Sequence, residues 1–341
     1  MKRILFFALV LIFSCSNEPQ NCDILIENGI IYDGTGDKPY KGVVAISNDK
    51  IIYVGKNKNF VADKVIDATD KAVSPGFINM LSWAYNSLMD DGRSLSDLKQ
   101  GVTLEVFGEG TSPGPSGNIK DNSYVSFGEA MQKLEDNGVS PNIASYLGAA
   151  TVRIQEIGYA NRKATDEEME SMREIVKSAM EEGAIGIGSS LIYAPGDYAD
   201  TDELIELSKV ASSYGGRYIS HMRNEDSRIL SAVDELIEIA EKADIPAEIY
   251  HLKASRKANY HLLDSVISRV EEARSRGLKI TADMYTYTAS STGLTGVIPT
   301  WVQEGGREAW INRMKRPDIR KRLFADIRKE LSEQPPEDIL M

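Results

Sequence analysis

The sequence predicts an α/β protein in which a small β module precedes a barrel of alternating strands and helices. Short apolar runs broken by turn dipeptides fill residues 23–72. After Pro75-Gly76, seven apolar strand-like runs alternate with segments of helical period, the pattern of parallel βα units. We therefore predict a (β/α)₈ TIM-type barrel with about seven strands present and the eighth missing. An open doubly wound sheet is the alternative, but no GxGxxG follows the first strand to support its dinucleotide-binding form.

The first 21 residues are expected to be a leader and a polar tether. Lys2 and Arg3 precede the apolar run 4–13, which is too short to span a bilayer as a permanent helix. The order Ile-Phe-Ser-Cys at 12–15 resembles a bacterial lipobox, so we expect lipidation of Cys15 and a place in the bacterial cell envelope. An ordinary cleaved signal peptide, and thus a periplasmic protein, is the alternative.

Residues 22–72 are predicted to form the small β module. Asn28-Gly29, Asp33-Gly34 and Asn48-Asp49 stand where hairpin turns are needed. Cys22 has no obvious partner and is expected to be a buried, unreactive thiol.

Residues 73–341 are predicted to form the incomplete barrel. Its strands are expected at 73–80, 102–107, 143–147, 184–187, 218–221, 247–252 and 279–285. Thr165 with Glu168 three residues later forms a capping-box pattern at the start of a helix. The helix places Met169, Met172, Val176 and Met180 on one face, which we interpret as a core stripe. From Ser290 onward the chain is expected to be helical and charged.

Composition excludes several classes of protein. The 341 residues are 42% apolar and 26% charged, as in a folded globular protein. The formal net charge of -12, with no basic stripe, argues against a nucleic-acid partner, because phosphate contacts need a basic face. Two cysteines exclude a disulfide framework and a cysteine-rich zinc module.

Two of the three histidines fall at equivalent positions: His221 closes the strand RYISH and His251 closes the strand AEIYH. Neighbouring parallel strands lie about 4.8 Å apart, so both imidazoles can reach one ion at the carboxyl rim of a barrel. We therefore predict that both are metal ligands. His261 lies on a predicted helix and is not expected to be a ligand.

The third ligand is expected to be a carboxylate from the strand GVTLEVFGEG. Glu109 lies at the carboxyl end of this strand in a glycine-rich turn and is the first choice. Glu105, within the strand, is the second, because an acidic side chain buried there needs a partner or a function. An exposed turn residue is the alternative interpretation of Glu109.

Four side chains near the histidines suit a substrate carboxylate. Lys253 follows His251 by two residues, and Arg223 follows His221 by two, so strand alternation places them on the same side as the imidazoles. Tyr193 and Tyr285 follow the fourth and seventh strands and could face the same mouth. Simple packing is the alternative for the tyrosines.

Several runs, in order along the chain, resemble the N-acyl-D-amino-acid deacylase (D-aminoacylase) family of the amidohydrolase superfamily. They lie between about Asp23 and about Arg316 and are DILIENGIIYDGTG, FVADKVIDATDKAVSPGFIN, KQGVTLEVFGEG, GAIGIGSSLIYAPGDYADTDEL, YISHMRNE, IYHLKAS and ADMYTYTAS. The resemblance implies a barrel with a small β-sandwich, a zinc centre and hydrolysis of N-acyl-D-amino acids. It also implies that the two strand-end histidines bind the metal, and that the lysine and both tyrosines named above contact the substrate carboxylate.

The sequence departs from this family's pattern in three places. Leu81 and Trp83 stand where the family has a His-x-His pair, and neither can coordinate a metal. GEG replaces the family's metal-binding cysteine, which is why Glu109 is favoured. The catalytic aspartate of the eighth strand would lie beyond residue 341, so we expect this form to have little deacylase activity. The resulting expectation is a single zinc ion, held by the histidine pair and Glu109.

The expected function is therefore metal-dependent hydrolysis of a linear amide, with a small N-acyl amino acid as substrate and contact with a membrane only through a lipid anchor. Two alternatives stay open. One is a catalytically impaired, ligand-binding lipoprotein with the same fold, and the other is an amidohydrolase that acts on a cyclic amide or a D-dipeptide.

Overall fold

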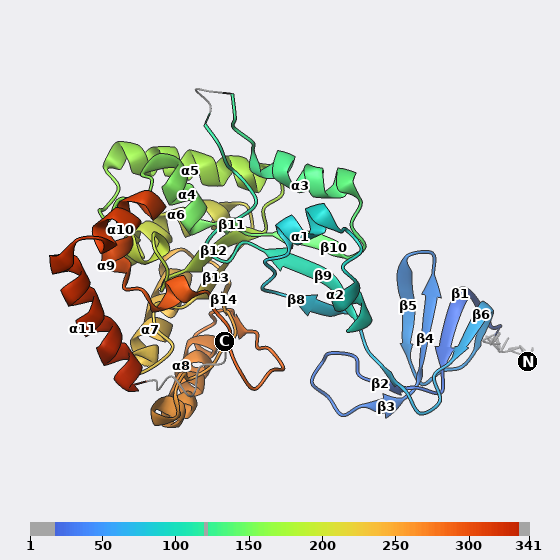
Figure 1. Ribbon diagram of the computed structural model, residues 1–341. Coiled ribbons are helices and arrows are strands. Elements are labelled where there is room, and N and C mark those ends of the chain that lie inside the picture. The colour runs from blue at the N-terminus through green and yellow to red at the C-terminus, as the bar shows by residue number, and fades with distance from the viewer. Residues whose placement is uncertain (1–17, 119–121, 334–341) are drawn as a thin grey trace, which may run out of the picture. The chain divides into compact units, whose positions relative to one another are not determined.

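The computed structural model describes residues 18–118 and 122–333, and the chain divides into two units, Met1–Gly76 and Phe77–Met341 (Figure 1). The proposed lipidation site, Cys15, lies outside the described residues. Among the described residues, no helix is long and apolar enough to cross a membrane.

The first unit consists of two small sheets. Its strands are β1 (Gln20–Glu27), β2 (Ile30–Ile31), β3 (Tyr40–Lys41), β4 (Val43–Ser47), β5 (Lys50–Gly55), β6 (Phe60–Asp67) and β7 (Ala72–Val73). One sheet has the order β5-β4-β1-β6 and the other the order β3-β2-β7. Cys22 and Leu25 of β1 pack with Val43 and Ala45 of β4 in a small apolar core, which confirms the prediction of a buried Cys22.

The predicted turns have three different outcomes. Asn48, with a left-handed φ of 53°, lies in the tight turn between the antiparallel strands β4 and β5, as expected for a hairpin. Asp33-Gly34 lies in a longer loop between β2 and β3. Asn28, also left-handed at 65°, joins β1 to β2, which belong to different sheets, so the prediction of a hairpin there is wrong.

The second unit is built on parallel strands. They are β8 (Phe77–Asn79), β9 (Val102–Phe107), β10 (Asn142–Ser145), β11 (Leu147–Gly148), β12 (Gly186–Ser190), β13 (Arg217–His221), β14 (Ala247–Ile249) and β15 (Ile280–Ala282). They form sheets of order β10-β9-β8 and β11-β12-β13-β14-β15, in which every pairing is parallel. The Ile185 N–H, directly before β12, donates to the carbonyl of Ser145, the last residue of β10. A hydrogen bond therefore connects the two sheets at this point. The fold is thus α/β with parallel sheets.

Two predicted strands are divided in the structure. The run 73–80 splits into β7, which pairs in the first unit, and β8, because Pro75 has no N–H to give to a ladder and interrupts the strand. The run 143–147 splits at Tyr146, between β10 and β11.

Helices cover the five-stranded sheet in sequence order, with α4 against α5, α5 against α6, α6 against α7 and α7 against α8 (Figure 1). The helices and helical turns that precede β13 are α1 (Tyr85–Asp90), α2 (Leu95–Lys99), α3 (Phe127–Asn137), α4 (Ala149–Glu156), α5 (Asp166–Glu181), η2 (Gly196–Tyr198) and α6 (Thr201–Ser213). Those that follow are α7 (Ile229–Lys242), η3 (Lys257–Leu262), α8 (Leu263–Ser275), η4 (Leu294–Val297), α9 (Thr300–Gln303), α10 (Gly306–Met314) and α11 (Pro317–Glu333). The helical character predicted after Ser290 is confirmed from η4 to the end of α11, where the described residues end.

The core of this unit lies between the helices and the five-stranded sheet. The capping box of Thr165 and Glu168 is present at the start of α5. Met172, Val176 and Met180 of the same helix are buried in the core, and Met169 packs against it, so the predicted core stripe is confirmed.

Candidate metal centre

Glu109, His221 and His251 come together at the carboxyl ends of the strands. One ligand atom from each lies within 4.8 Å of the other two. The closest approach is 2.8 Å, between His221 Nδ1 and Glu109 Oε1, and His251 Nε2 lies 3.6 Å from the same oxygen. The side chains are 7%, 7% and 11% exposed in that order, so the cluster is nearly closed to solvent.

His221 is the last residue of β13, as predicted. β13 pairs in parallel with β12, and the register sets His221 opposite Ser190. The His221 and His251 rings meet edge to face, with centroids 4.5 Å apart. The two imidazoles therefore converge, as the equivalent strand-end positions led us to expect.

His251 reaches the cluster by a different route from the predicted one. β14 ends at Ile249, and His251 lies in a turn with a left-handed φ of 36°. The prediction of a strand through residue 252 is thus wrong at its end, because a left-handed residue cannot continue a strand. Asp283, just after β15, fixes the turn: its Oδ1 accepts the His251 N–H at 2.6 Å.

Glu109 lies two residues beyond β9, between Gly108 (φ 107°) and Gly110 (φ 69°). A side chain on Gly108 would collide with the Tyr146 carbonyl, so this turn requires glycine. The other carboxylate oxygen of Glu109, Oε2, accepts the indole N–H of Trp83 at 2.8 Å. The carboxylate is therefore held on one side by Trp83 and offers Oε1 to the histidines.

Glu105, the second choice for a third ligand, has different partners. It is fully buried, and its two oxygens accept from the hydroxyls of Ser82 and Ser94, each at 2.7 Å. Its place in the strand is thus explained by two hydroxyl donors, and the three-residue cluster contains Glu109 instead.

The charges in the cluster stabilise one another. Burial acts to raise the pKa of Glu109, but hydrogen bonds from His221, His251 and Trp83 outweigh it and lower this pKa to about 2. Burial acts to lower the pKa of His251, but contacts with Glu109 and a further carboxylate, Glu225, raise it to about 9. At neutral pH the metal-free cluster therefore holds an ionised Glu109 and a protonated His251.

Glu225 is a residue of this site that our sequence reasoning missed. Its Oε1 lies 3.0 Å from His251 Nδ1 and 2.7 Å from Lys253 Nζ, and its Oε2 lies 3.9 Å from His221 Nε2. It stands four residues after His221 in the loop HMRNED, where hydrophobic periodicity carries no information. An acidic residue in the loop that follows a ligand-bearing strand was the available signal.

Three predicted substrate-binding side chains surround the histidines. Lys253 Nζ lies 3.0 Å from His251 Nδ1, although a turn rather than strand alternation brings it there. Tyr193 packs edge-on against His221 with ring centroids 5.4 Å apart, and its hydroxyl bonds Thr292 Oγ1 at 2.8 Å. The Tyr285 ring lies 6.5 Å from that of His251 and 5.6 Å below the Lys253 ammonium.

Arg223, the fourth predicted side chain, is directed elsewhere. Its guanidinium forms a two-pronged ion pair with Glu235 of α7 and donates to the carbonyls of Asp197 and Ala199. The expectation that Arg223 lies beside His221 fails because β13 ends at His221, and strand alternation does not extend past that point. Arg223 ties the loop to α7.

The remaining sequence predictions concern residues expected not to bind a metal. Leu81 packs against the apolar cluster of Val106, Tyr146, Ile219 and Tyr250. His261 is exposed in η3 and is not a member of the cluster.

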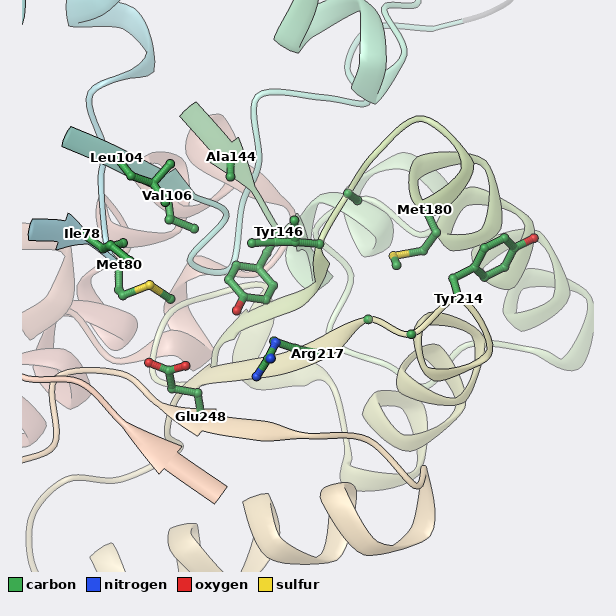
Figure 2. A pocket seen from close by; sticks show the side chains of 14 residues that line it. Ile78, Met80, Leu104, Val106, Ala144, Tyr146, Met180, Tyr214, Arg217 and Glu248 are labelled. Atoms are coloured by element: carbon green, nitrogen blue, oxygen red, sulfur yellow. The ribbon is translucent and has the colours of Figure 1, made fainter. Parts of the chain in front are cut away.

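A separate apolar cavity of about 550 Å³ lies between the two parallel sheets (Figure 2). Leu104 and Val106 of β9 border it on one side, and Arg217 and Glu248, at the amino-terminal parts of β13 and β14, on the other. None of the cluster residues lines it, so it is distinct from the candidate metal centre.

The donor set of the cluster fits a zinc ion. Two imidazole nitrogens and one carboxylate oxygen are a common catalytic zinc set, which leaves a fourth position open. Tetrahedral zinc with bonds of about 2.0 Å separates its ligand atoms by about 3.3 Å. Glu109 Oε1 lies 2.8 Å from His221 Nδ1 and 3.6 Å from His251 Nε2, on either side of this value. Small side-chain rotations would therefore bring the three atoms to the separations that zinc requires.

Comparison with known proteins finds similar sequences and similar solved structures, while no family model matches. The chain is 28% identical to D-aminoacylase of Alcaligenes xylosoxydans xylosoxydans over 82% of its own length and 60% of that protein. It is 27% identical to an N-acyl-D-glutamate deacylase of the same organism, over 80% and 58% of the two chains. The chain thus spans about 60% of the length of these relatives.

Solved structures give the same result. The crystal structure of D-aminoacylase, which defines a novel subset of amidohydrolases, matches with a TM-score of 0.68 at 28% identity, over 79% of this chain and 59% of that one. The N-acyl-D-glutamate deacylase of Bordetella bronchiseptica, complexed with zinc and a phosphonate inhibitor, matches with a TM-score of 0.69 at 25% identity, over the same shares. The resemblance inferred from the sequence motifs is confirmed: the chain is a homologue of D-aminoacylase and of the N-acyl-D-amino-acid deacylases.

Proposed function

We propose that this chain carries the metal centre of a hydrolase that cleaves linear amides, with N-acyl-D-amino acids as substrates. The proposal rests on one observation: His221, His251 and Glu109 each place a ligand atom within 4.8 Å of the other two, close enough to bind one metal ion. The similarity to deacylases over four fifths of the chain supports the choice of reaction.

The ligand atoms we assign are His221 Nδ1, His251 Nε2 and Glu109 Oε1. The ammonium of Lys253 lies 3.0 Å from His251 Nδ1 and would repel a metal ion bound there, so we assign the other nitrogen, Nε2, as the ligand atom. When bound, zinc would polarise the amide carbonyl and lower the pKa of a water molecule.

We assign one ion to the centre. Leu81 and Trp83 cannot coordinate a metal, and the Trp83 indole already donates to the second oxygen of Glu109. Glu109 is thereby left with one oxygen for coordination, so it is poorly suited to bridge two ions.

Lys253 is proposed to bind the substrate's α-carboxylate, with Tyr193 and Tyr285 beside it. Its distance of 3.0 Å from His251 sets a carboxylate next to the metal ligands, and an acyl amide attached to the same α-carbon would then lie over the ion. With the carboxylate and the amide fixed, the side chain and the hydrogen take the two remaining positions on the α-carbon, and a site that admits the side chain in only one of them selects one enantiomer.

Two structural assignments accompany this function. We propose that the parallel sheets belong to a (β/α)₈ barrel and that the first unit is part of a β-sandwich, as the 28% identical D-aminoacylase structure suggests. From the leader sequence we also propose that Cys15 is lipidated and holds the protein at the bacterial envelope. Incorporation of labelled palmitate, absent in Cys15→Ser, tests the anchor.

Zinc stoichiometry tests the centre directly. After loading and dialysis, we expect one zinc per chain, with loss of that zinc in Glu109→Gln. Glu105→Gln is the matched control, because it alters a buried carboxylate four residues earlier, within β9, that bonds serines instead of histidines. A protein without stoichiometric zinc, or an equal loss in both variants, would refute the assignment.

Substrate class is tested with whole protein by release of free amine from N-acetyl-D-amino acids, with the L-isomers as controls. We expect hydrolysis of the D-isomers in preference to the L-isomers. Hydrolysis of hydantoins or D-dipeptides in their place would favour the cyclic-amide or dipeptide alternative.

A further inference from the structure

Glu225 completes a closed square of charged and polar groups in which each imidazole lies between two carboxylates. His221 meets Glu109 through Nδ1 at 2.8 Å and faces Glu225 through Nε2 at 3.9 Å. His251 faces Glu109 through Nε2 at 3.6 Å and meets Glu225 through Nδ1 at 3.0 Å. The two carboxylates therefore lie on opposite nitrogens of the same two rings.

The loop that carries Glu225 is fixed by its own hydrogen bonds. Asn224 Oδ1 accepts the backbone N–H groups of Asp226 and Arg228, and the Ser255 N–H donates to the Glu225 carbonyl at 2.7 Å. The Glu225 side chain is only 12% exposed. A buried carboxylate on an anchored loop is held in place before any ligand arrives.

We propose that Glu225 is a positioning residue that sets the tautomer and orientation of both metal-binding histidines and links them to Lys253. The inference rests on the proposed function. An imidazole that gives Nε2 or Nδ1 to a metal carries its proton on the other nitrogen, and that N–H needs an acceptor. Glu225 Oε1 lies 3.0 Å from His251 Nδ1 and accepts from it. Glu225 Oε2 faces His221 Nε2 at 3.9 Å, beyond hydrogen-bond distance, and that nitrogen is buried without a partner, so a small rotation of the carboxylate would supply its acceptor.

The same carboxylate also accepts from Lys253 Nζ at 2.7 Å. Lys253 has no acceptor capacity, so the hydrogen bond of His251 Nδ1–H goes to Glu225 and not to the lysine. The negative charge of Glu225 thus holds the proposed carboxylate-binding ammonium and the metal-binding imidazole side by side. Metal affinity and substrate placement depend on one side chain that touches neither ion nor substrate.

Zinc affinity measured by competition with a chromophoric chelator tests this role in the full chain. We expect Glu225→Gln to bind zinc about 10- to 100-fold more weakly than the parent, as loss of a carboxylate behind a metal-binding histidine does in other zinc sites. Glu225→Asp keeps the charge with a shorter reach, and its affinity should fall between the two. The melting temperature of each zinc-free variant shows whether it is folded.

Glu235→Gln is the matched control, because the Glu235 side chain is also 12% exposed and ion-paired, but with Arg223 of the loop and not with the cluster. Its zinc affinity should equal that of the parent. Equal affinity of Glu225→Gln and parent, within threefold, overturns the positioning role and leaves the metal centre intact. Complete loss of zinc in Glu225→Gln, as in Glu109→Gln, also overturns it and makes Glu225 a ligand. Absence of zinc from the parent overturns the proposed function and the positioning role together.

Discussion

Zinc affinity is predicted to depend steeply on pH, because the metal must displace a proton from His251. The pKa of this imidazole is raised to about 9 in the metal-free protein by Glu109 and Glu225, despite burial. Two pH units below that pKa, displacing the proton costs about a hundredfold in affinity, or about 2.7 kcal/mol. We therefore expect the zinc affinity to rise about tenfold per pH unit between pH 6.5 and 8.5.

The assay is a chelator competition in zinc-buffered solutions at several pH values, with proton release measured by calorimetry in buffers of different ionisation enthalpy. His261→Asn, a change at the exposed third histidine, should leave the slope unchanged. An affinity that stays within threefold across this range would show that His251 is neutral in the metal-free protein, and the charge assignment of the cluster would be wrong.

The same protonation predicts that the stability of metal-free protein falls with rising pH, whereas that of zinc-loaded protein does not. The pKa of His251 is higher folded than its ordinary value of 6.5, so its contribution to the free energy of unfolding is complete below pH 6.5 and is lost as the pH rises through about 9. The melting temperature of EDTA-treated protein should therefore fall over this range. Zinc-loaded protein should show no such fall, because the bound ion already keeps the proton off His251 and the tighter binding at higher pH offsets the stability that the metal-free protein loses. Parallel trends would contradict the assignment.

Three further predictions concern single side chains. Trp83→Phe removes the indole donor to Glu109 and should weaken zinc binding about fivefold, the worth of a hydrogen bond of about 1 kcal/mol, in the same chelator titration. Arg153→Ala leaves Glu203 buried without its ion-pair partner, and urea denaturation should show a loss of about 3–5 kcal/mol, whereas an unchanged midpoint would contradict it. Arg223→Met should lower the melting temperature while leaving the Kd of zinc-loaded protein for N-acetyl-D-amino acids within twofold, and a large rise in Kd would restore its role in substrate binding.

The sequence predicts those parts of the fold that local patterns control. The strand at 102–107 matches β9 at both ends, because an apolar run there is bounded by Gly101 and Gly108. The start of α5 is equally well predicted, because the capping box is a contact between residues three apart. Both histidines were found from their positions at the ends of neighbouring strands.

The errors lie where distant residues determine the local conformation. Nothing near His251 in the sequence indicates a left-handed turn, because the carboxylate that stabilises it, Asp283, comes 32 residues later. Arg223 was placed by strand alternation, which ends with β13, and its true partners lie on α7 and in the η2 loop. Glu225 was missed for the same reason, since only the folded loop brings its carboxylate to both imidazoles.

The left-handed turn at His251 matters to anyone who wishes to transplant this centre into a designed scaffold. A residue with a side chain in this conformation is strained by about 1–3 kcal/mol, and here the Asp283 carboxylate offsets that cost from the next strand. If the three proposed ligands were grafted onto ideal parallel strands, the His251 side chain would not point toward the other two. A design has to include Asp283 as well as the three ligands, so the transplanted segment must extend beyond the ligand-bearing strands to the end of β15.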